Sequence, residues 1–204
     1  MCILVGCKPG TIPTREELVL GSESNPHGFG YAIVIDGKMV VNKSMKPDAL
    51  IDEFLELRRA NMNSCAIFHA RYASHGSIDI DNCHPFYLGE DKQSVLAHNG
   101  NFPNDNQPKD SSCSDTRWFA ETVMPSLGGI QSLDNPVFCE MLINWSGSNR
   151  VIFLTANAEM ESQMYTIGYE HGSVDDDGVW WSNDFHKWFA PMGASSKFGS
   201  SLPS

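Results

Sequence analysis

The chain has 204 residues, of which 41% are hydrophobic and 19% charged, and its formal net charge is −11 at pH 7. This length and composition are typical of one globular domain with a full-sized core. The negative charge argues against nucleic acid as a partner, because affinity for a phosphate backbone comes from clustered lysine and arginine. No apolar run is long enough to cross a bilayer, and the N-terminus lacks the features of a signal peptide. We therefore expect a cytoplasmic protein with no membrane partner.

The first part of the chain predicts strands and helices in mixed order. Residues 2–6 (CILVG) form an apolar run typical of a buried strand. Thr14 and Glu17 have the spacing of a capping box, which predicts a helix over 14–20. Residues 28–43 predict a hairpin, because Asp36-Gly37 between two β-rich runs is a type I′ turn signal. An amphipathic helix is predicted over 46–60, with a proline in its first turn.

The second part predicts further strands at 64–73, 93–100, 150–156, 163–169 and 178–183. Ser114 can cap a helix over 115–124, and 136–145 is a second helical run. The strands flank the helices without a βαβ rhythm, which favours a layered α+β fold with antiparallel pairing. We expect one domain over residues 1–190 and a flexible tail over 191–204, where small, polar residues predominate.

The cysteines form no CxxC pair, and a reducing compartment disfavours disulfides. Cys65 and Cys139 lie in apolar runs and are expected in the core. Cys2 admits two interpretations. It is either a small hydrophobe at the start of a buried strand, or a nucleophile that shares its residue with a free α-amine once Met1 is removed.

Four short stretches place polar residues near strand ends: FHARYASHG (68–76), NCHPF (82–86), AHNG (97–100) and CSDTRW (113–118). Each has a non-catalytic explanation. Asn99-Gly100 can be a hairpin turn, and Asp115 can complement a helix dipole. Arg71 can be an edge charge, and His84-Pro85 a loop. Taken singly, none of these stretches establishes a site.

Metal and nucleotide sites are not expected. His69, His75, Cys83 and His84 are candidate zinc ligands, but they lie on one strand and the loop that follows it, whereas zinc ligands usually come in pairs from two elements. The acidic runs at 77–82 and 175–177 are predicted to be solvated loops, since they lack the longer series of oxygen ligands and the terminal Glu of a calcium-binding loop. No GxGxxG or P-loop occurs, so no cofactor is expected.

Taken together, these stretches resemble a known family. Cys2 followed in order by NPHGFGYAI, HARYASHG, NCHPF, AHNG and SDTRWFAE is similar to the class II glutamine amidotransferases, which are N-terminal-nucleophile hydrolases. The resemblance covers about residues 2–122 and extends to GVWWSN (178–183). It implies a four-layer αββα sandwich of two mostly antiparallel sheets.

The resemblance also implies roles in the reaction. Cys2 would attack the side-chain amide of glutamine, with its own α-amine handling the proton. The Asn99 side chain and the Gly100 N–H would form the oxyanion hole. Arg71 would bind the substrate α-carboxylate and Asp115 the α-ammonium group. A zwitterionic amino acid needs one cation and one anion at a fixed spacing, and arginine binds a carboxylate bidentately.

Further residues are placed around the substrate by the same resemblance. Ser74 and His75 would line the pocket, and His84 would shape it without titrating in the reaction. Gly28 would lie on the strand that approaches the nucleophile. Two positions depart from the family: Ile3 stands where glycine is frequent, and Tyr72 where tryptophan is common, so the lid over the substrate is expected to differ.

The activity implied is hydrolysis of L-glutamine to glutamate and ammonia. Family members often fuse this domain to a synthase domain, so we expect this chain to work with a separate synthase or ATP-dependent amide ligase. An alternative is a stand-alone amidase that acts on another γ-glutamyl compound without ammonia transfer. A catalytically silent binding module is disfavoured, because every implied catalytic group is present.

Overall fold

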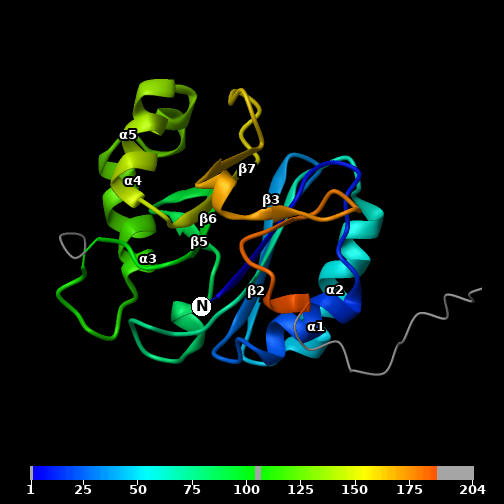
Figure 1. Ribbon diagram of the computed structural model, residues 1–204. Helices are drawn as coiled ribbons and strands as arrows, with labels where there is room; N and C mark the ends of the chain where they lie inside the picture. The colour runs from blue at the N-terminus through cyan, green and yellow to red at the C-terminus, as the bar shows by residue number, and fades with distance from the viewer. Residues whose placement is uncertain (1, 104–106, 188–204) are drawn as a thin grey trace, which may run out of the picture.

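Two antiparallel sheets form the centre of the computed structural model, which describes residues 2–103 and 107–187 (Figure 1). Within these residues the larger sheet has the order β3-β2-β4-β1-β10-β9, and the smaller one has the order β5-β6-β7-β8. The larger sheet contains β1 (Ile3–Cys7), β2 (Phe29–Ile35), β3 (Lys38–Ser44), β4 (Ala66–Ala70), β9 (Ser173–Val174) and β10 (Trp180–Trp181). The smaller sheet contains β5 (Phe86–Leu88), β6 (Asp91–Asn99), β7 (Arg150–Thr155) and β8 (Met164–Ile167).

Helices cover the outer face of each sheet. On the larger sheet these are α1 (Arg15–Glu23) and α2 (Pro47–Ala60). On the smaller sheet they are α3 (Asp115–Trp118), a π-helical turn (Phe119–Val123), α4 (Met124–Ser126) and α5 (Pro136–Ser146). Short 3₁₀ turns occupy 80–82, 129–134, 169–171 and 185–187. No helix in the described ranges is long and apolar enough to span a membrane.

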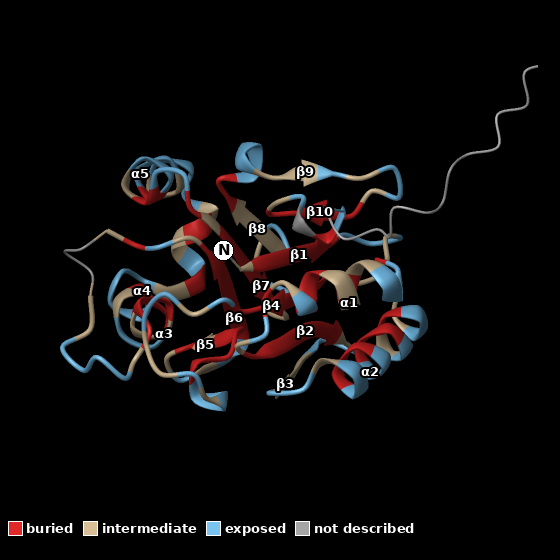
Figure 2. Ribbon diagram, turned by 60° about the horizontal axis from the view of Figure 1, so that its bottom comes forward, coloured by how far each residue is buried: buried red, intermediate tan, exposed pale blue. Residues whose placement is uncertain are grey.

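Three apolar clusters hold the layers together. One packs α1 and α2 on the larger sheet, and another packs the π-helical turn, α4 and α5 on the smaller sheet. The third lies between the sheets and includes Leu4, Ile67, Val95 and Ile152. Figure 2 shows the buried strands in the middle and the exposed helix surfaces outside. The predicted αββα sandwich is therefore confirmed.

Most local predictions hold. Thr14 and Glu17 form both hydrogen bonds of the capping box, and Asp36 and Gly37 have positive φ angles of 49° and 70° at the hairpin turn. Ser114 caps α3 by accepting a hydrogen bond from the Arg117 N–H. The tail predicted at 191–204, together with the end of the predicted domain, lies outside the described residues.

Two local predictions need correction, and two strands were not expected. The strand β5 is defined by its pairing with β6, and β9 by its pairing with β10. The helix predicted over 115–124 contains a π-helical turn, because the Gly89 N–H donates to the Ala120 carbonyl while the Met124 N–H reaches back to Phe119. Cys139 is half-buried at the edge of a cluster, not in the core, whereas Cys65 is buried.

Arg58 ties together the chain at one end of the larger sheet. Its guanidinium is fully buried and donates to the carbonyls of Lys8, Thr11, Asn61 and Ser64 at 2.7–2.8 Å. We expect Arg58→Ala to lower the free energy of unfolding by about 3 kcal/mol, because four carbonyl acceptors lose a charged donor that is itself fully buried. Urea denaturation measures the loss. The adjacent, exposed Arg59→Ala is the control, and an equal loss there would contradict the prediction.

Candidate active site

The N-terminus lies where the ends of the two sheets meet, as the N label of Figure 1 shows. Cys2 directly precedes β1, which pairs with β4 so that Ile3 lies opposite Ala70. The residues after β4 therefore pass beside Cys2. In the other sheet, β6 ends at Asn99 on the same side. The two sheets thus bring the ends of β1, β4 and β6 together.

The Cys2 thiol is half-buried and contacts the backbone of Tyr72. Its Sγ atom accepts a hydrogen bond from the Tyr72 N–H at 3.3 Å, and the Cys2 carbonyl accepts one from Asn183 Nδ2 at 2.7 Å. Burial raises the pKa of the Cys2 thiol, while the Tyr72 hydrogen bond and the Arg71 charge act in the opposite direction. A thiol in this environment needs a nearby base to form a thiolate near neutral pH.

A small cavity adjoins Cys2 and is lined by most of the predicted site residues. These are Cys2, Arg71, Tyr72, Ser74, His75, His84, Gly100 and Asp115, together with Ala73, His98, Ser114 and Thr116. The space inside is about 20 Å³, enough for one water molecule. Asn99 and Gly28 are the predicted site residues that do not line it.

Arg71 follows β4 and is only 2% exposed, so the edge-charge alternative is wrong. Its guanidinium donates from Nη1 to the Ser77 carbonyl at 2.8 Å and from Nη2 to the His75 carbonyl at 2.7 Å. These bonds use two of the five N–H donors of an arginine. Burial lowers the pKa of Arg71, and the thiol of Cys2 is the first of the groups that oppose this shift.

Asp115 is the first residue of α3, and its carboxylate is held by three donors. Oδ2 accepts from the Phe102 N–H at 2.9 Å, and Oδ1 accepts from the Thr116 N–H at 2.7 Å and from the Thr116 hydroxyl at 3.2 Å. The position suits the helix dipole, and the side chain also lines the cavity. A fixed anion and a fixed cation, Asp115 and Arg71, therefore border one cavity.

The backbone at Gly100 requires glycine. Its φ is +147°, and a Cβ atom there would lie 1.8 Å from Asn149 Oδ1. The hairpin-turn alternative for Asn99-Gly100 is wrong, because the residue that pairs with Asn99 is Arg150 of β7. The turn after β6 instead leads toward the start of α3.

Asn99 is fully buried and contacts the larger sheet. Its Nδ2 donates to Ser182 Oγ at 2.8 Å, and the same oxygen accepts from the Leu4 N–H at 2.9 Å. Ser182 therefore links the end of β6 to the strand that begins behind Cys2. The amide Oδ1 of Asn99 is buried and has no hydrogen-bond partner among the described residues.

Three buried histidines lie close together at the cavity, and two of them, His84 and His98, line it. The rings of His69 and His84 stack with centroids 3.9 Å apart, and His84 Nδ1 accepts from the His98 N–H at 3.1 Å. His98 contacts the Thr116 hydroxyl and Asn149 Oδ1, each at 2.8 Å. Burial lowers the pKa of His69 to about 3, and also lowers the pKa values of His84 and His98. Burial therefore disfavours the charged form of each of the three rings.

The remaining predicted residues surround the cavity on its outer side or support it. Tyr72 is exposed and packs against the His27 ring at 4.9 Å. Ser74 donates to Asn101 Oδ1 at 2.6 Å. Gly28, with φ +128°, accepts from the Arg71 N–H at 2.8 Å, and a Cβ atom there would lie 2.2 Å from Cys83 Sγ. Gly28 thus holds the backbone of Arg71 in place.

The structure does not assemble the candidate zinc ligands. Among the residues it describes, no group of three or more His, Cys, Asp or Glu side chains is arranged to hold a metal ion. His69 instead donates from Nε2 to the His98 carbonyl at 3.0 Å. The acidic loop at 175–177 is structural, since Asp175 accepts hydrogen bonds from the Val179 N–H and the Trp181 indole.

A larger groove lies on the helical side of the smaller sheet. It has about 340 Å³ of space and is lined by Phe119, Val123, Leu127, Phe138, Met141, Leu142 and Trp145. All of these side chains are apolar, so the groove offers no nucleophile, acid or base.

Sequence reasoning missed several residues that hold the site. His98 and Thr116 lie inside the AHNG and SDTRW stretches, so their neighbours along the chain were a signal for them. Asn82 and Ser182 also lie inside quoted stretches, NCHPF and GVWWSN, but their contacts with Ser114 and Asn99 cross large gaps in the sequence. No local pattern points to such contacts.

Comparison with known proteins agrees with the fold. The solved structure of glutamine phosphoribosylpyrophosphate amidotransferase from B. subtilis, complexed with ADP and GMP, matches 89% of this chain and 41% of its own, with a TM-score of 0.52 and 20% identity. An allosteric regulatory enzyme of purine biosynthesis gives the same coverage and TM-score at 18% identity. This chain therefore spans less than half the length of either protein.

A glutamine aminotransferase class-II domain protein from Silicibacter pomeroyi matches 88% of this chain and 87% of its own, with a TM-score of 0.44 and 15% identity. No curated protein matches the chain. At 20% and 18% identity, the first two solved structures show the shared fold alone.

The family comparison goes further. The family profile for glutamine amidotransferases class-II matches residues 21–162, which is more than half of the chain. The matched segment contains Arg71, Asn99, Gly100 and Asp115, whereas Cys2 precedes it. The resemblance deduced from the sequence is confirmed, and the chain is an amide-hydrolysing enzyme domain that belongs to the class II glutamine amidotransferases.

Proposed function

We propose that this chain hydrolyses the side-chain amide of L-glutamine, with Cys2 as the nucleophile after removal of Met1. The observation that carries the proposal is the single cavity that Cys2 shares with a buried cation, Arg71, and a buried anion, Asp115. These charges match the α-carboxylate and α-ammonium groups of an amino acid. The amide carbon would then lie toward the thiol.

In the proposed reaction the Cys2 α-amine takes the thiol proton, and the sulfur attacks the amide carbon. The proton passes to the leaving nitrogen, ammonia departs, and a thioester remains on Cys2. Water then attacks the thioester, which releases glutamate and restores the thiol. The α-amine suits this role, since the pKa of an unperturbed α-amine, about 7.7–8.0, lies close to that of a free thiol, about 8.5.

Substrate entry requires the cavity to widen, because about 20 Å³ cannot hold an amino acid. The outer wall is the segment 72–75, where Tyr72, Ser74 and His75 are exposed. We propose that this segment moves outward to admit glutamine and returns to exclude water. Gly100 N–H and the Asn99 amide would stabilise the oxyanion, since one Nδ2 hydrogen of Asn99 remains after the bond to Ser182.

Asn99→Ala is expected to lower kcat about 10²–10³-fold, the usual cost of losing one oxyanion donor. Steady-state kinetics on glutamine measure the effect, and circular dichroism checks the fold. Ser182→Ala is the matched control, since it removes the acceptor that Asn99 contacts but leaves the Asn99 amide in place. An unchanged kcat in Asn99→Ala with lowered stability would assign the residue a structural role instead.

The ammonia is proposed to pass to a separate synthase or ATP-dependent amide ligase. We expect slow glutamine hydrolysis by the chain alone and a higher kcat/KM when such a partner and its acceptor are bound, because closure would exclude water. Glutaminase assays with and without a partner captured by pull-down measure the coupling. Full activity alone, with faster cleavage of a γ-glutamyl peptide than of glutamine, would favour the stand-alone amidase.

A further inference from the structure

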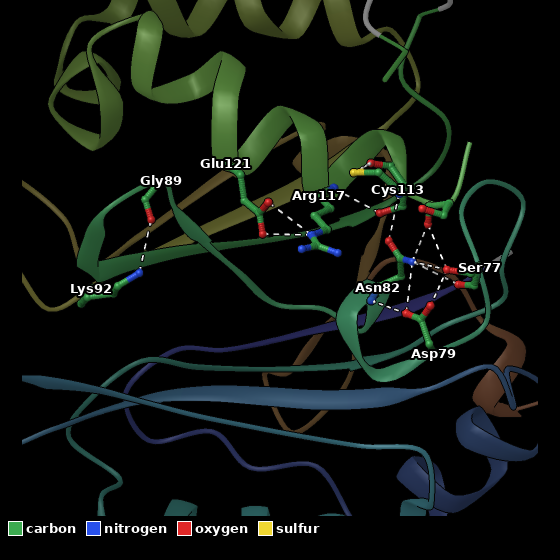
Figure 3. A network of polar contacts seen from close by, with 10 residues as sticks. Ser77, Asp79, Asn82, Gly89, Lys92, Cys113, Arg117 and Glu121 are labelled. Carbon is green, nitrogen blue, oxygen red and sulfur yellow. Dashed lines mark hydrogen bonds and ion pairs between the residues drawn. The ribbon is translucent and has the colours of Figure 1, made fainter. Parts of the chain in front are cut away.

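We propose that Asn82 is a positioning residue, which sets the spacing between the proposed carboxylate anchor, Arg71, and the proposed ammonium anchor, Asp115. The inference rests on the proposed function of the cavity. Asn82 is 1% exposed and ends the short 3₁₀ turn 80–82. Figure 3 shows its side chain at the centre of a polar network with Ser77 and Asp79.

The side-chain amide of Asn82 contacts both the segment that leads to Arg71 and the segment that leads to Asp115. Its Nδ2 lies 2.8 Å from the Ser112 carbonyl, 3.0 Å from Ser77 Oγ and 3.3 Å from the Ser77 carbonyl. Its Oδ1 accepts a hydrogen bond from the Ser114 N–H at 2.9 Å. Asp79 Oδ1 accepts from the Asn82 N–H at 3.1 Å, which fixes the backbone of the turn.

One side of this network leads to Arg71. The Ser77 carbonyl that Asn82 contacts also accepts the Arg71 Nη1 hydrogen bond at 2.8 Å. A shift of Ser77 therefore shifts the guanidinium. The Ser77 N–H also donates to the Ser112 carbonyl at 3.0 Å, and this is the carbonyl that Asn82 Nδ2 contacts. The segments that contain Ser77 and Ser112 therefore meet at the Asn82 amide.

The other side leads to Asp115. Ser114 caps α3, and Asp115 follows it as the first residue of the helix. The backbone of Gly76 lies close to that of Ser114, since a Cβ atom at Gly76 would lie 2.7 Å from the Ser114 nitrogen. Asn82 thus holds the N-terminus of α3 through the Ser114 N–H.

The two anchors belong to different layers of the fold. Arg71 follows β4 of the larger sheet, whereas Asp115 begins a helix that packs on the smaller sheet. Apolar contacts join the sheets, and such contacts are non-directional. The directional hydrogen bonds of Asn82 fix the relative position of the anchors, and misplacement by about 1 Å can cost about 10²-fold in rate.

Asn82→Asp tests this role, because it keeps the shape but replaces the two amide hydrogens with an acceptor. We expect kcat/KM for glutamine to fall about 10–100-fold, mainly through a higher KM. The monoamide of glutaric acid lacks the α-ammonium group, so the wild-type protein should hydrolyse it more slowly than glutamine. Its kcat/KM should change much less than that of glutamine in Asn82→Asp. Alkylation of Cys2 by iodoacetamide needs no anchor and should keep its rate.

Asn61→Asp is the matched control, since Asn61 is partly buried, donates to the Leu57 carbonyl and lies at the end of α2. Equal losses on glutamine and on the analogue, or no loss, would overturn the inference. If Asn82→Asp does not fold, Asn82→Ala is judged in the same way, by comparing its loss of kcat/KM on glutamine with its loss on the analogue. Failure of both to fold, while Asn61→Asp folds, would make Asn82 purely structural. A wild-type protein without amidase activity would instead refute the proposed function.

Discussion

Replacing Cys2 with alanine is expected to lower kcat for glutamine about 10⁴-fold or more, because no other group can form the thioester. Within the described residues, Cys2 is the only cysteine that lines the cavity between Arg71 and Asp115. The variant should keep its stability, since the side chain is half-buried and small. Glutaminase kinetics measure the loss.

Mass spectrometry gives an independent readout of the same prediction. A diazoketone that mimics glutamine should add covalently to Cys2 in a protein that has lost Met1. Cys113→Ala is the matched control, because Cys113 is also half-buried but does not line the cavity. Undiminished labelling of Cys2→Ala, or an active preparation that keeps Met1, would refute the nucleophile assignment.

Arg71→Ala and Asp115→Ala are each expected to lower kcat/KM for glutamine about 10²–10³-fold, because each removes a charge that would pair with the substrate in a buried site. KM should rise most, since the proposed anchors would hold groups remote from the scissile amide. Some loss of kcat is also expected, because remote binding energy orients the reacting centre.

Two measurements separate this effect from a general loss of structure. Thermal unfolding reports stability, which matters because Arg71 also holds the His75 and Ser77 carbonyls. Arg117→Ala is the control, since Arg117 lies two residues after Asp115 but pairs with Glu121 on the surface. Unchanged kcat/KM in both anchor variants would show that the amino-acid head group binds elsewhere.

The sequence by itself determined much of the local structure. The capping box at Thr14, the turn at Asp36-Gly37 and the cap at Ser114 depend on residues within a few positions of one another. Such signals act through the chain itself, so they can be identified without the fold. The order of the motifs also led to the family, which the match over 21–162 confirms.

Only the tertiary structure decided how these pieces meet. The strand β5 exists through its pairing with β6, and the π-helical turn after α3 exists because Gly89 contacts the Ala120 carbonyl. The bond between Asn99 and Ser182 likewise joins residues 83 positions apart. Each contact depends on how the two sheets and their helices pack, which residues close in sequence do not encode. For that reason the sequence indicated which residues would form the site, whereas packing decided which of them line the cavity and which hold it in place.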